Sequence, residues 1–264
     1  MKTMLVFPQL SSGAVAQMPL KRRAEYRTLL NQALDGNEIR VADASFVQRA
    51  WQLPLQSLSD EEWQAIQTLF AATEGQLQTF LFLEPGANLL KWSEDFTQAA
   101  WVSAGITIAG GITDPTGGAA ASELTGAGTL SQSLNVPAAY RYAGSIWART
   151  SQPGASLQLS DGASQQASVA FVGDGQWRRY TLSTAWGGSS QSVVFTVATG
   201  GAAALDTYGA QLEAQVQASA YKQTLQQSGV HPAARFGSDT LGDRATSPGQ
   251  HSGVLQIKWT PSQT

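Results

Sequence analysis

Turn-forming residues recur through the middle of the chain and divide it into short runs with the composition of β-strands. Between residues 89 and 222, Gly, Asp and Pro separate about eight to ten such runs at intervals of about 8–12 residues. The clearest runs are residues 140–149, 156–159, 168–172, 177–183, 193–198 and 205–212. No convincing helical pattern interrupts them, so we expect a β-sandwich or jelly roll.

The balance of charge narrows the classes of function. Charged residues make up 13% of the 264 residues, about half the usual ~25%. Lys and Arg number 16 against 19 Asp and Glu, with no basic block, so we expect no nucleic-acid partner. The absence of cysteine excludes disulfides and a Cys nucleophile. No apolar run approaches the ~20 residues of a membrane span, and we expect neither a membrane partner nor a signal peptide.

Residues 1–88 have a different sequence pattern, which is typical of a small α+β unit. Residues 26–34 are strand-like and lead into Asp35-Gly36, a strong hairpin signal, and residues 38–42 would form the return strand. In residues 47–55, period-two spacing predicts a third strand with one apolar face, formed by Val47, Trp51, Leu53 and Leu55. Pro54 cannot donate to a ladder, so this strand should lie at an edge or end there.

One segment has both the spacing and the caps of a helix. Ser59 with Glu62 three residues later forms a capping box, and Gly75 is suited to a left-handed C-terminal cap. The apolar face of the predicted helix consists of Trp63, Ile66, Leu69 and Phe70. A strand over residues 79–83 follows, and the order β-β-β-α-β predicts a helix covering a small antiparallel sheet.

Residues 253–259 alternate between polar and apolar side chains and form the clearest strand near the C-terminus. The apolar set is Leu255, Ile257 and Trp259. A lone strand cannot satisfy its own backbone groups, so we expect it to complete the first sheet. The predicted fold is therefore mainly β, with a small α+β domain over residues 1–88 plus 223–264 and an inserted β-sandwich or jelly-roll domain over residues 89–222.

The first domain resembles a known family. Its pattern is Trp51-x-Leu53-x-Leu55-x-x-Leu58-Ser59-x-x-Glu62, then Ile66-x-x-Leu69-Phe70, Gly75 and Thr79-Phe80-Leu81-Phe82-x-x-Pro85. This order resembles the distal-tail or minor-tail protein family of long-tailed phages, and the opening Phe7-Pro8-Gln9-Leu10 and the Asp35-Gly36 turn agree with it. The resemblance covers residues 5–88, and the C-terminal strand would belong to the same tail-ring domain.

The middle of the chain resembles a second family. The landmarks are the run from Asn88 to Phe96 with Ala100-Trp101, the stretches 145–149 and 174–180, and finally Tyr208-Gly-Ala-Gln-Leu-Glu213 with Tyr221. In this order they are similar to the carbohydrate-binding-module-like jelly rolls that are commonly appended to phage tail and virion proteins. This resemblance covers about 130 residues.

Together the resemblances imply a structural virion protein, located at the distal end of a phage or phage-like tail. It would form a ring of six copies that links the tail tube to the hub or tip proteins, with the jelly roll at the periphery in contact with host surface polysaccharide. The alternative is a carbohydrate-binding adhesin or receptor-binding protein. An accessory module of a polysaccharide-degrading enzyme is disfavoured by the lack of a catalytic set.

The aromatic residues offer a candidate glycan contact. Along residues 140–149, Trp147 and Arg149 alternate with the set that we assign to the core, so they face the other side of the sheet, where a concave groove can lie. Trp186, beside two glycines, would lie on a loop at the rim of that groove. The alternative is that these tryptophans fill the core between two sheets or a contact between subunits.

We identify no catalytic, metal or cofactor site and expect that the chain is not an enzyme. Asp60-Glu61-Glu62 suits a helix cap, and Glu94-Asp95 and the pair Asp239 and Asp243 suit turns better than paired catalytic carboxylates. The two histidines, His231 and His251, stand beside Pro, Gly or Ser, which favours exposed loops.

Residues 8–25 offer a candidate for contact with a neighbouring subunit. Pro8 and Pro19 bound a polar stretch that continues into Lys21-Arg22-Arg23, which favours an extended arm or loop. Such an arm could reach the next subunit or the tube. The alternative is a solvated surface loop.

Overall fold

The computed structural model describes residues 4–202 and 204–261, apart from the side chains of residues 44–46 and 246. The chain divides into two compact units. Unit 1 comprises residues 4–10, 16–82 and 231–261, and unit 2 comprises residues 11–15 and 83–230. These limits lie a few residues from the predicted domain boundaries, because residues 11–15, 83–88 and 223–230 cluster with unit 2.

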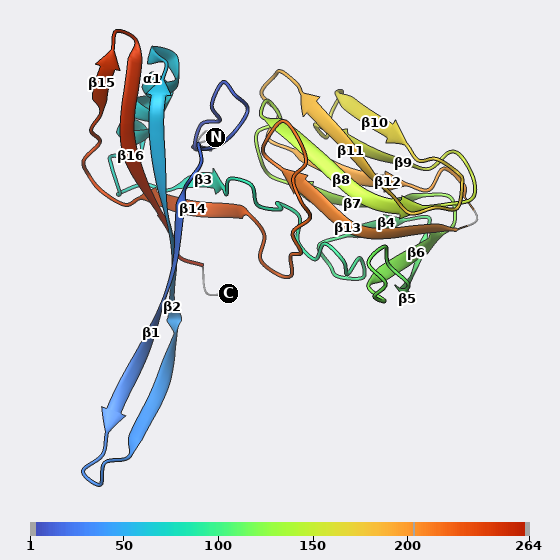
Figure 1. Ribbon diagram of the computed structural model, residues 1–264, viewed down its shortest axis with the longest axis horizontal. Helices are drawn as coiled ribbons and strands as arrows, with labels where there is room; N and C mark the ends of the chain where they lie inside the picture. Colours follow the sequence, from blue (N-terminus) through green and yellow to red (C-terminus); the bar gives the residue numbers. More distant parts are fainter. Residues whose placement is uncertain (1–3, 203, 262–264) are drawn as a thin grey trace. The chain divides into compact units, whose positions relative to one another are not determined.

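The mainly β fold is confirmed. The described residues contain sixteen strands, arranged in three antiparallel sheets, and one helix, α1. In unit 1 the strand order is β1-β2-β16-β14-β3, with β15 paired to the other end of β16 (Figure 1). These strands are β1 (Lys21–Gln32), β2 (Glu38–Leu58), β3 (Phe80–Leu83), β14 (Val230–Phe236), β15 (Arg244–Ser247) and β16 (Gln250–Trp259).

Strand β2 corrects the prediction of two separate strands, because residues 38–58 form one continuous strand. A bulge leaves residues 44–46 without partners on β1, between the pairs Tyr26–Val47 and Arg27–Asp43. Beyond it, the outer parts of β1 and β2 pair only with each other. We call residues 27–43 the finger, and Figure 1 shows it extending away from the rest of the unit 1 sheet.

Pro54 lies where β2 has a partner on one side only. It is opposite Val254 of β16, whereas β1 begins at Lys21, opposite Gln52. The missing N–H of this proline therefore falls where β1 offers no partner, as the predicted edge position requires.

Helix α1 (Asp60–Ala72) confirms the predicted N-terminal capping box, whereas its C-cap residue is Thr73, two residues before Gly75, and the left-handed backbone begins at Glu74. The Ser59 side chain accepts a hydrogen bond from the Glu62 amide at 3.2 Å, and the Glu62 side chain accepts one from the Ser59 amide at 3.0 Å. After the helix, Gly75 adopts φ +67°. The helix buries Trp63, Ile66 and Leu69 against the sheet. It is neither long nor apolar enough to cross a membrane.

The register of the unit 1 sheet separates an apolar face from a polar face. Trp51, Ile257 and Phe236 are directly opposite one another on β2, β16 and β14, and all three are buried. The Phe70 ring of α1 lies 5.1 Å from the Phe236 ring, so the helix covers this face. Since side chains alternate along a strand, the neighbouring row, which contains Ala50, Lys258 and Arg235, lies on the face opposite the helix.

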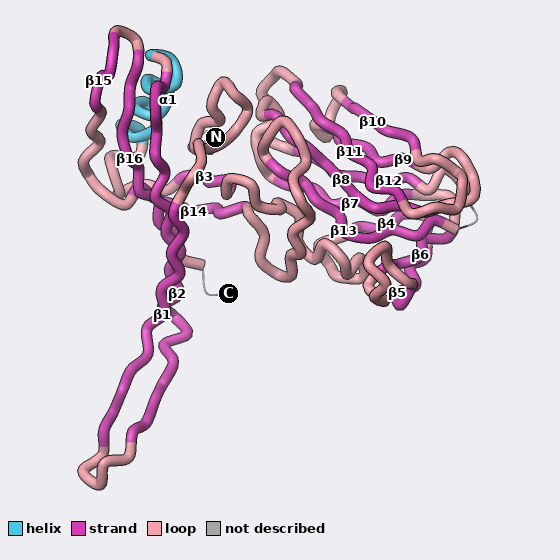
Figure 2. The backbone as a smooth tube through the Cα atoms, in the orientation of Figure 1, coloured by secondary structure: helices cyan, strands magenta, loops and turns pink. Residues whose placement is uncertain are grey.

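Unit 2 is a β-sandwich of two five-stranded sheets (Figure 2). The sheet orders are β10-β9-β12-β7-β4 and β11-β8-β13-β6-β5. The strands are β4 (Val102–Ala104), β5 (Thr107–Ile112), β6 (Ala121–Thr125), β7 (Thr129–Leu134), β8 (Arg141–Arg149), β9 (Ser156–Ser160), β10 (Gln166–Ala170), β11 (Arg178–Ala185), β12 (Val193–Ala198) and β13 (Leu205–Glu213). The two sheets approach closely at Gly144, where a Cβ would lie 3.2 Å from Leu159 of the facing sheet.

We expect Ile257→Ala to destabilise unit 1 by about 2–5 kcal/mol, because this completely buried side chain lies at the centre of the apolar face. Val254→Ala, in the same strand but 55% exposed, should change the free energy of unfolding by no more than about 0.5 kcal/mol. Denaturant titration with hydrogen exchange of β2 and β14 measures both variants. Equal effects would contradict this placement of β16.

Candidate functional site

The outer face of one sheet in unit 2 carries the candidate glycan residues. On β8, Tyr142, Ile146 and Ala148 are buried in the sandwich. Trp147 and Arg149 alternate with them and therefore lie together on the outer face. On the adjacent strand β13, Tyr208 is opposite Trp147 and Asp206 is opposite Arg149.

Part of this outer face is covered by residues 214–228, which we call the cover segment. The Arg179 guanidinium of β11 donates a hydrogen bond to the Ser219 carbonyl at 2.6 Å and another to the Ser145 hydroxyl at 2.9 Å. Ser145 and Gln211, on the same sheet, are completely buried. A ligand can therefore reach only the part of the face that the cover segment leaves open.

A buried carboxylate holds the cover segment in place. Glu213 is 0% exposed and accepts hydrogen bonds from the Ser219 amide at 2.8 Å, the Ser219 hydroxyl at 2.6 Å and the Gln211 side chain at 2.8 Å. The Lys222 ammonium lies 3.3 Å from the same carboxylate. A buried charge is tolerated when it is paired and fully hydrogen-bonded, and Glu213 meets both conditions.

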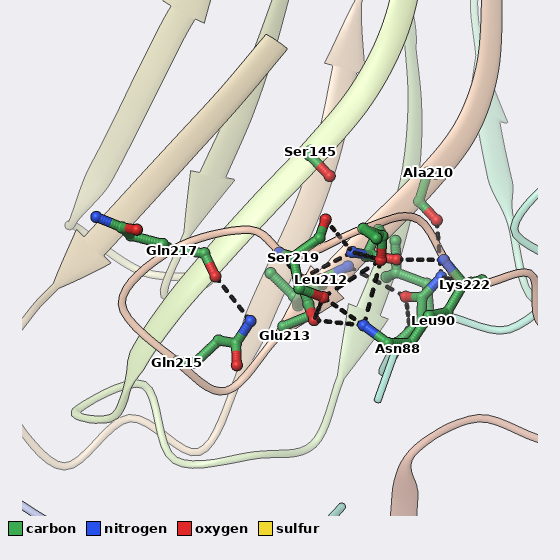
Figure 3. Close-up of polar contacts among 12 residues, drawn as sticks. Asn88, Leu90, Ser145, Ala210, Leu212, Glu213, Gln215, Gln217, Ser219 and Lys222 are labelled. Carbon is green, nitrogen blue, oxygen red and sulfur yellow. Dashed lines mark hydrogen bonds and ion pairs between the residues drawn. The ribbon is translucent and has the colours of Figure 1, made fainter. Parts of the chain in front are cut away.

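Asn88 connects the same segment to the first residues of unit 2. Its side-chain amide donates to the carbonyls of Ala210 at 2.9 Å and Lys222 at 3.1 Å. Its side-chain oxygen accepts from the amides of Leu90 and Leu212, both at 3.1 Å. One buried side chain thus joins three separate stretches of backbone, as Figure 3 shows.

The open part of the face is formed by Trp147, Arg149 and Asp206. The Arg149 and Asp206 side chains are 32% and 15% exposed and form an ion pair, with nitrogen–oxygen distances of 2.7 and 2.8 Å. The Arg149 guanidinium also lies 4.9 Å from the centre of the Trp177 ring. This arrangement presents a cation, a carboxylate and aromatic edges to solvent, a combination that suits polar ring-shaped ligands.

The Trp147 ring is held on several sides. The Arg179 guanidinium lies 4.7 Å from the ring centre, and the Tyr221 ring meets it edge-on at 5.7 Å. At Gly209, with φ +67°, a Cβ would lie 3.1 Å from the indole, so the close approach of β13 requires glycine. Trp147 is therefore a fixed, half-buried aromatic edge and not a free stacking platform.

Two tyrosines border this ring. Burial, together with a hydrogen bond to Glu94, raises the pKa of Tyr208 to about 12. Burial likewise raises the pKa of Tyr221, whose hydroxyl lies 2.7 Å from the Ser93 hydroxyl and donates to Glu94 at 3.0 Å. Both phenols therefore stay protonated near neutral pH and act as hydrogen-bond donors.

Trp186 is not brought to this site. Trp147 is opposite Arg179 of β11, whereas the last residue of β11, Ala185, is opposite Arg141 at the other end of β8. Trp186 follows Ala185 and is separated from Trp147 by about 20 Å along the strand direction. The predicted trio of Trp147, Arg149 and Trp186 is reduced to the first two.

The basic residues at the start of the chain also lie elsewhere than predicted. Lys21, Arg22 and Arg23 are the first residues of β1, opposite Gln52, Trp51 and Ala50 of β2. The proposed arm over residues 8–25 therefore ends in a paired strand, because the neighbouring β2 satisfies its backbone.

The prediction for the histidines is wrong, since neither lies in an exposed loop. His231 on β14 is 1% exposed, and its ring centre lies 4.7 Å from that of Trp51. His251 on β16 stacks on Trp63 at 5.8 Å. Asp95 accepts hydrogen bonds within its own turn from Thr97 and Gln98, in agreement with its assignment to a turn.

His251 lies between two carboxylates. Its Nδ1 is 2.5 Å from Asp243 and its Nε2 is 2.8 Å from Asp60 at the start of α1. Both contacts raise the pKa of His251, that to Asp243 more than that to Asp60, because only the imidazolium can donate from both nitrogens. Among the described residues, no group of three or more His, Asp or Glu side chains has the geometry to hold a metal ion.

We expect His251→Gln to destabilise unit 1 at acidic pH and to have a smaller effect at alkaline pH. The folded-state pKa lies above the ordinary value of 6.5, so the stabilisation is complete below 6.5 and is lost as pH rises through the folded-state pKa. Melting temperatures of wild type and variant across pH 5–9 measure the difference, with Gln250→Ala as the exposed neighbouring control. A difference that grows with rising pH would contradict the prediction.

No protein-family model and no curated protein matches this chain. Among solved structures, the enzymatically active domain of tailspike protein 4 from bacteriophage CBA120 matches with a TM-score of 0.38 and 8% identity, over 47% of this chain and 20% of that one. The CBM22-1 xylan-binding domain of Paenibacillus barcinonensis Xyn10C matches with a TM-score of 0.37 and 19% identity, over 50% and 94%. The module TmCBM61, in complex with β-1,4-galactotriose, matches with a TM-score of 0.37 and 17% identity, over 47% and 97%.

These structural neighbours are carbohydrate-binding modules and one phage tailspike domain, and each match covers about half of this chain. The matched part spans a fifth of the tailspike chain. The resemblance of the first domain to the distal-tail family stays a prediction.

Proposed function

We propose that this chain is a structural assembly protein whose copies join to one another through the finger. Three large apolar side chains of the finger carry the proposal. Leu29 is directly opposite Val41 in the register of β1 and β2, and Ile39 is two residues further along β2 on the same face. Their exposed fractions are 50%, 46% and 59%, respectively.

An isolated two-stranded ribbon of this kind is marginally stable in water, and a contiguous exposed apolar face favours a protein partner. Four of the five charged residues of the finger form ion pairs, Arg27 with Asp43 and Arg40 with Glu38, and the fifth, Asp35, accepts hydrogen bonds from Asn37 at the tip. Pairing of the charges beside the apolar face lowers the desolvation cost of covering it. A second copy of the same chain is the partner that we propose.

The resemblance of residues 5–88 to distal-tail proteins supports a more specific form of the proposal. In this form, six copies close a ring at the distal end of a phage or phage-like tail and connect the tail tube to the hub or tip proteins. The sandwich lies at the periphery of the ring. The protein acts by binding and positioning its partners and not as an enzyme.

We expect wild-type protein to self-associate and Leu29→Lys/Val41→Lys to weaken that association at least tenfold, because two charges would have to be buried in an apolar contact. Sedimentation velocity with negative-stain imaging measures oligomer size. Thr28→Lys/Gln32→Lys provides the matched control, since these residues lie on the other face of the finger.

Wild-type protein that is monomeric at every concentration would overturn the proposal, and so would equal association of the two lysine variants. Circular dichroism and melting temperature, unchanged in both variants, exclude unfolding as the cause of any loss.

A second candidate function, glycan binding, is favoured by the open face around Trp147, Arg149 and Asp206. Its support is the half-buried aromatic edge beside a cation and a carboxylate, which are the groups that orient sugar hydroxyls. In this version the chain is an adhesin or receptor-binding protein, or a ring protein whose periphery contacts host surface polysaccharide.

Replacing Trp147 and Arg149 with alanine should abolish binding of purified protein to host surface polysaccharide in a pull-down or calorimetric assay. Trp186→Ala is the matched control, because the structure places that residue away from the site. Binding that survives the double replacement in a variant of unchanged melting temperature would exclude this face as the glycan site.

A further inference from the structure

Cations gather on the face of the unit 1 sheet that lies opposite α1. Arg23, Ala50, Lys258 and Arg235 form one row across β1, β2, β16 and β14, each directly opposite the next. Four neighbouring strands span about 14 Å. Lys21 lies on the same face, opposite Gln52.

The backbone and side chains around this row form two adjoining hollows of about 580 and 430 Å³. Both are lined by Gln48 and Lys258, so they form one continuous surface, which we call the basic groove. Among the described residues that line them, the one carboxylate is Glu25, which pairs with Arg23 at 3.1 Å. The lining has five cations, namely Lys21, Arg22, Arg23, Arg235 and Lys258, which leave a local excess of positive charge.

Carboxylates gather on the helix side of the same unit. At the N-terminal end of α1, Asp60, Glu61 and Glu62 are consecutive, and Asp243 adjoins them through His251. We call these four residues the acidic end. Even with His251 protonated, four carboxylates leave an excess of negative charge, and Glu61 at the first turn is exposed.

We propose that the basic groove of one copy binds the acidic end of a second copy. The proposal rests on the self-association proposed above. It adds a second contact between copies, besides the one that the finger makes. The two surfaces are of opposite charge and lie on opposite faces of one sheet, so each copy carries both halves of the contact. We choose a second copy as the partner because this chain itself carries a surface of the opposite charge.

The contact is heterologous: one surface meets a different surface on the neighbour. Such contacts continue from copy to copy until the rotation closes a ring. Because solvent screens exposed charges beyond a Debye length of about 10 Å at 0.1 M salt, the contact should weaken as salt increases.

Two complementary changes of charge test the contact in the whole 264-residue chain. The groove variant is Arg235→Glu/Lys258→Glu, and the acidic-end variant is Glu61→Lys/Gln64→Lys, in which both replaced side chains are exposed on one helix face. Alone, each variant cancels the net charge of one of the two surfaces, so the attraction is lost at every contact. Mixed in equal amounts, the two variants can still pair, because the unchanged groove of one meets the unchanged acidic end of the other.

We expect each variant alone to associate at least tenfold more weakly than wild type in sedimentation velocity at low salt, and the mixture to associate more strongly than either variant alone. High salt should reduce the difference between wild type and variants. Lys91→Glu and Glu74→Lys are the controls, since these exposed residues lie outside the groove and the acidic end, and they should associate as wild type does.

Wild-type association by a single variant, or a mixture that associates no better than its components, would overturn the groove contact while leaving the proposed function intact. Wild-type protein that never self-associates would overturn both proposals. If the groove variant lost binding to an acidic polysaccharide but associated as wild type does, this result would also count against the groove contact.

Discussion

Strand β16 lies between β2 and β14, and the unit 1 sheet is continuous only because residues 250–259 fill this position. Leu255 and Ile257 are buried there, so the strand supplies both backbone partners and core. The chain leaves the sheet after β3 and returns at β14, which is the neighbour of β3. Because these two ends adjoin, the whole sandwich can be inserted between them without breaking the ladder.

The sequence predicted those elements that depend on residues close together in the chain. The capping box of Ser59 and Glu62 defines the start of α1, and period two predicted the buried face of β16. The ten strands β4 to β13 agree with the eight to ten expected, but the sequence did not locate β4 to β7. A strand such as β5, with its two glycines and largely exposed side chains, has no apolar alternation. Nor did the sequence predict that β2 would run through residues 43–46, because nothing local distinguishes a bulge from a break.

Only the part of the candidate site that follows from the alternation of side chains along a strand was predictable from the sequence. Alternation on β8 placed Trp147 and Arg149 on one face, but Trp186 was assigned to the same groove without knowledge of where β11 ends. The cover segment was not predictable. The burial of Glu213 depends on Ser219 and Lys222 in a stretch without periodicity, and on Asn88, which is 124 residues away from Leu212 along the chain. Such tertiary hydrogen bonds leave no pattern in the sequence.

Unit 1 carries three surfaces that we propose neighbouring copies cover: an apolar finger, a basic groove and an acidic end. In the assembly that we propose, the groove and the acidic end lie on opposite faces of one sheet, so one two-fold contact cannot bury both in the same pair of molecules. Each copy therefore needs a different neighbour on each side. The apolar area of the finger then supplies affinity that salt does not screen. The charged contact supplies the specificity, because only faces of opposite charge attract each other. This division of roles favours a closed ring over a dimer.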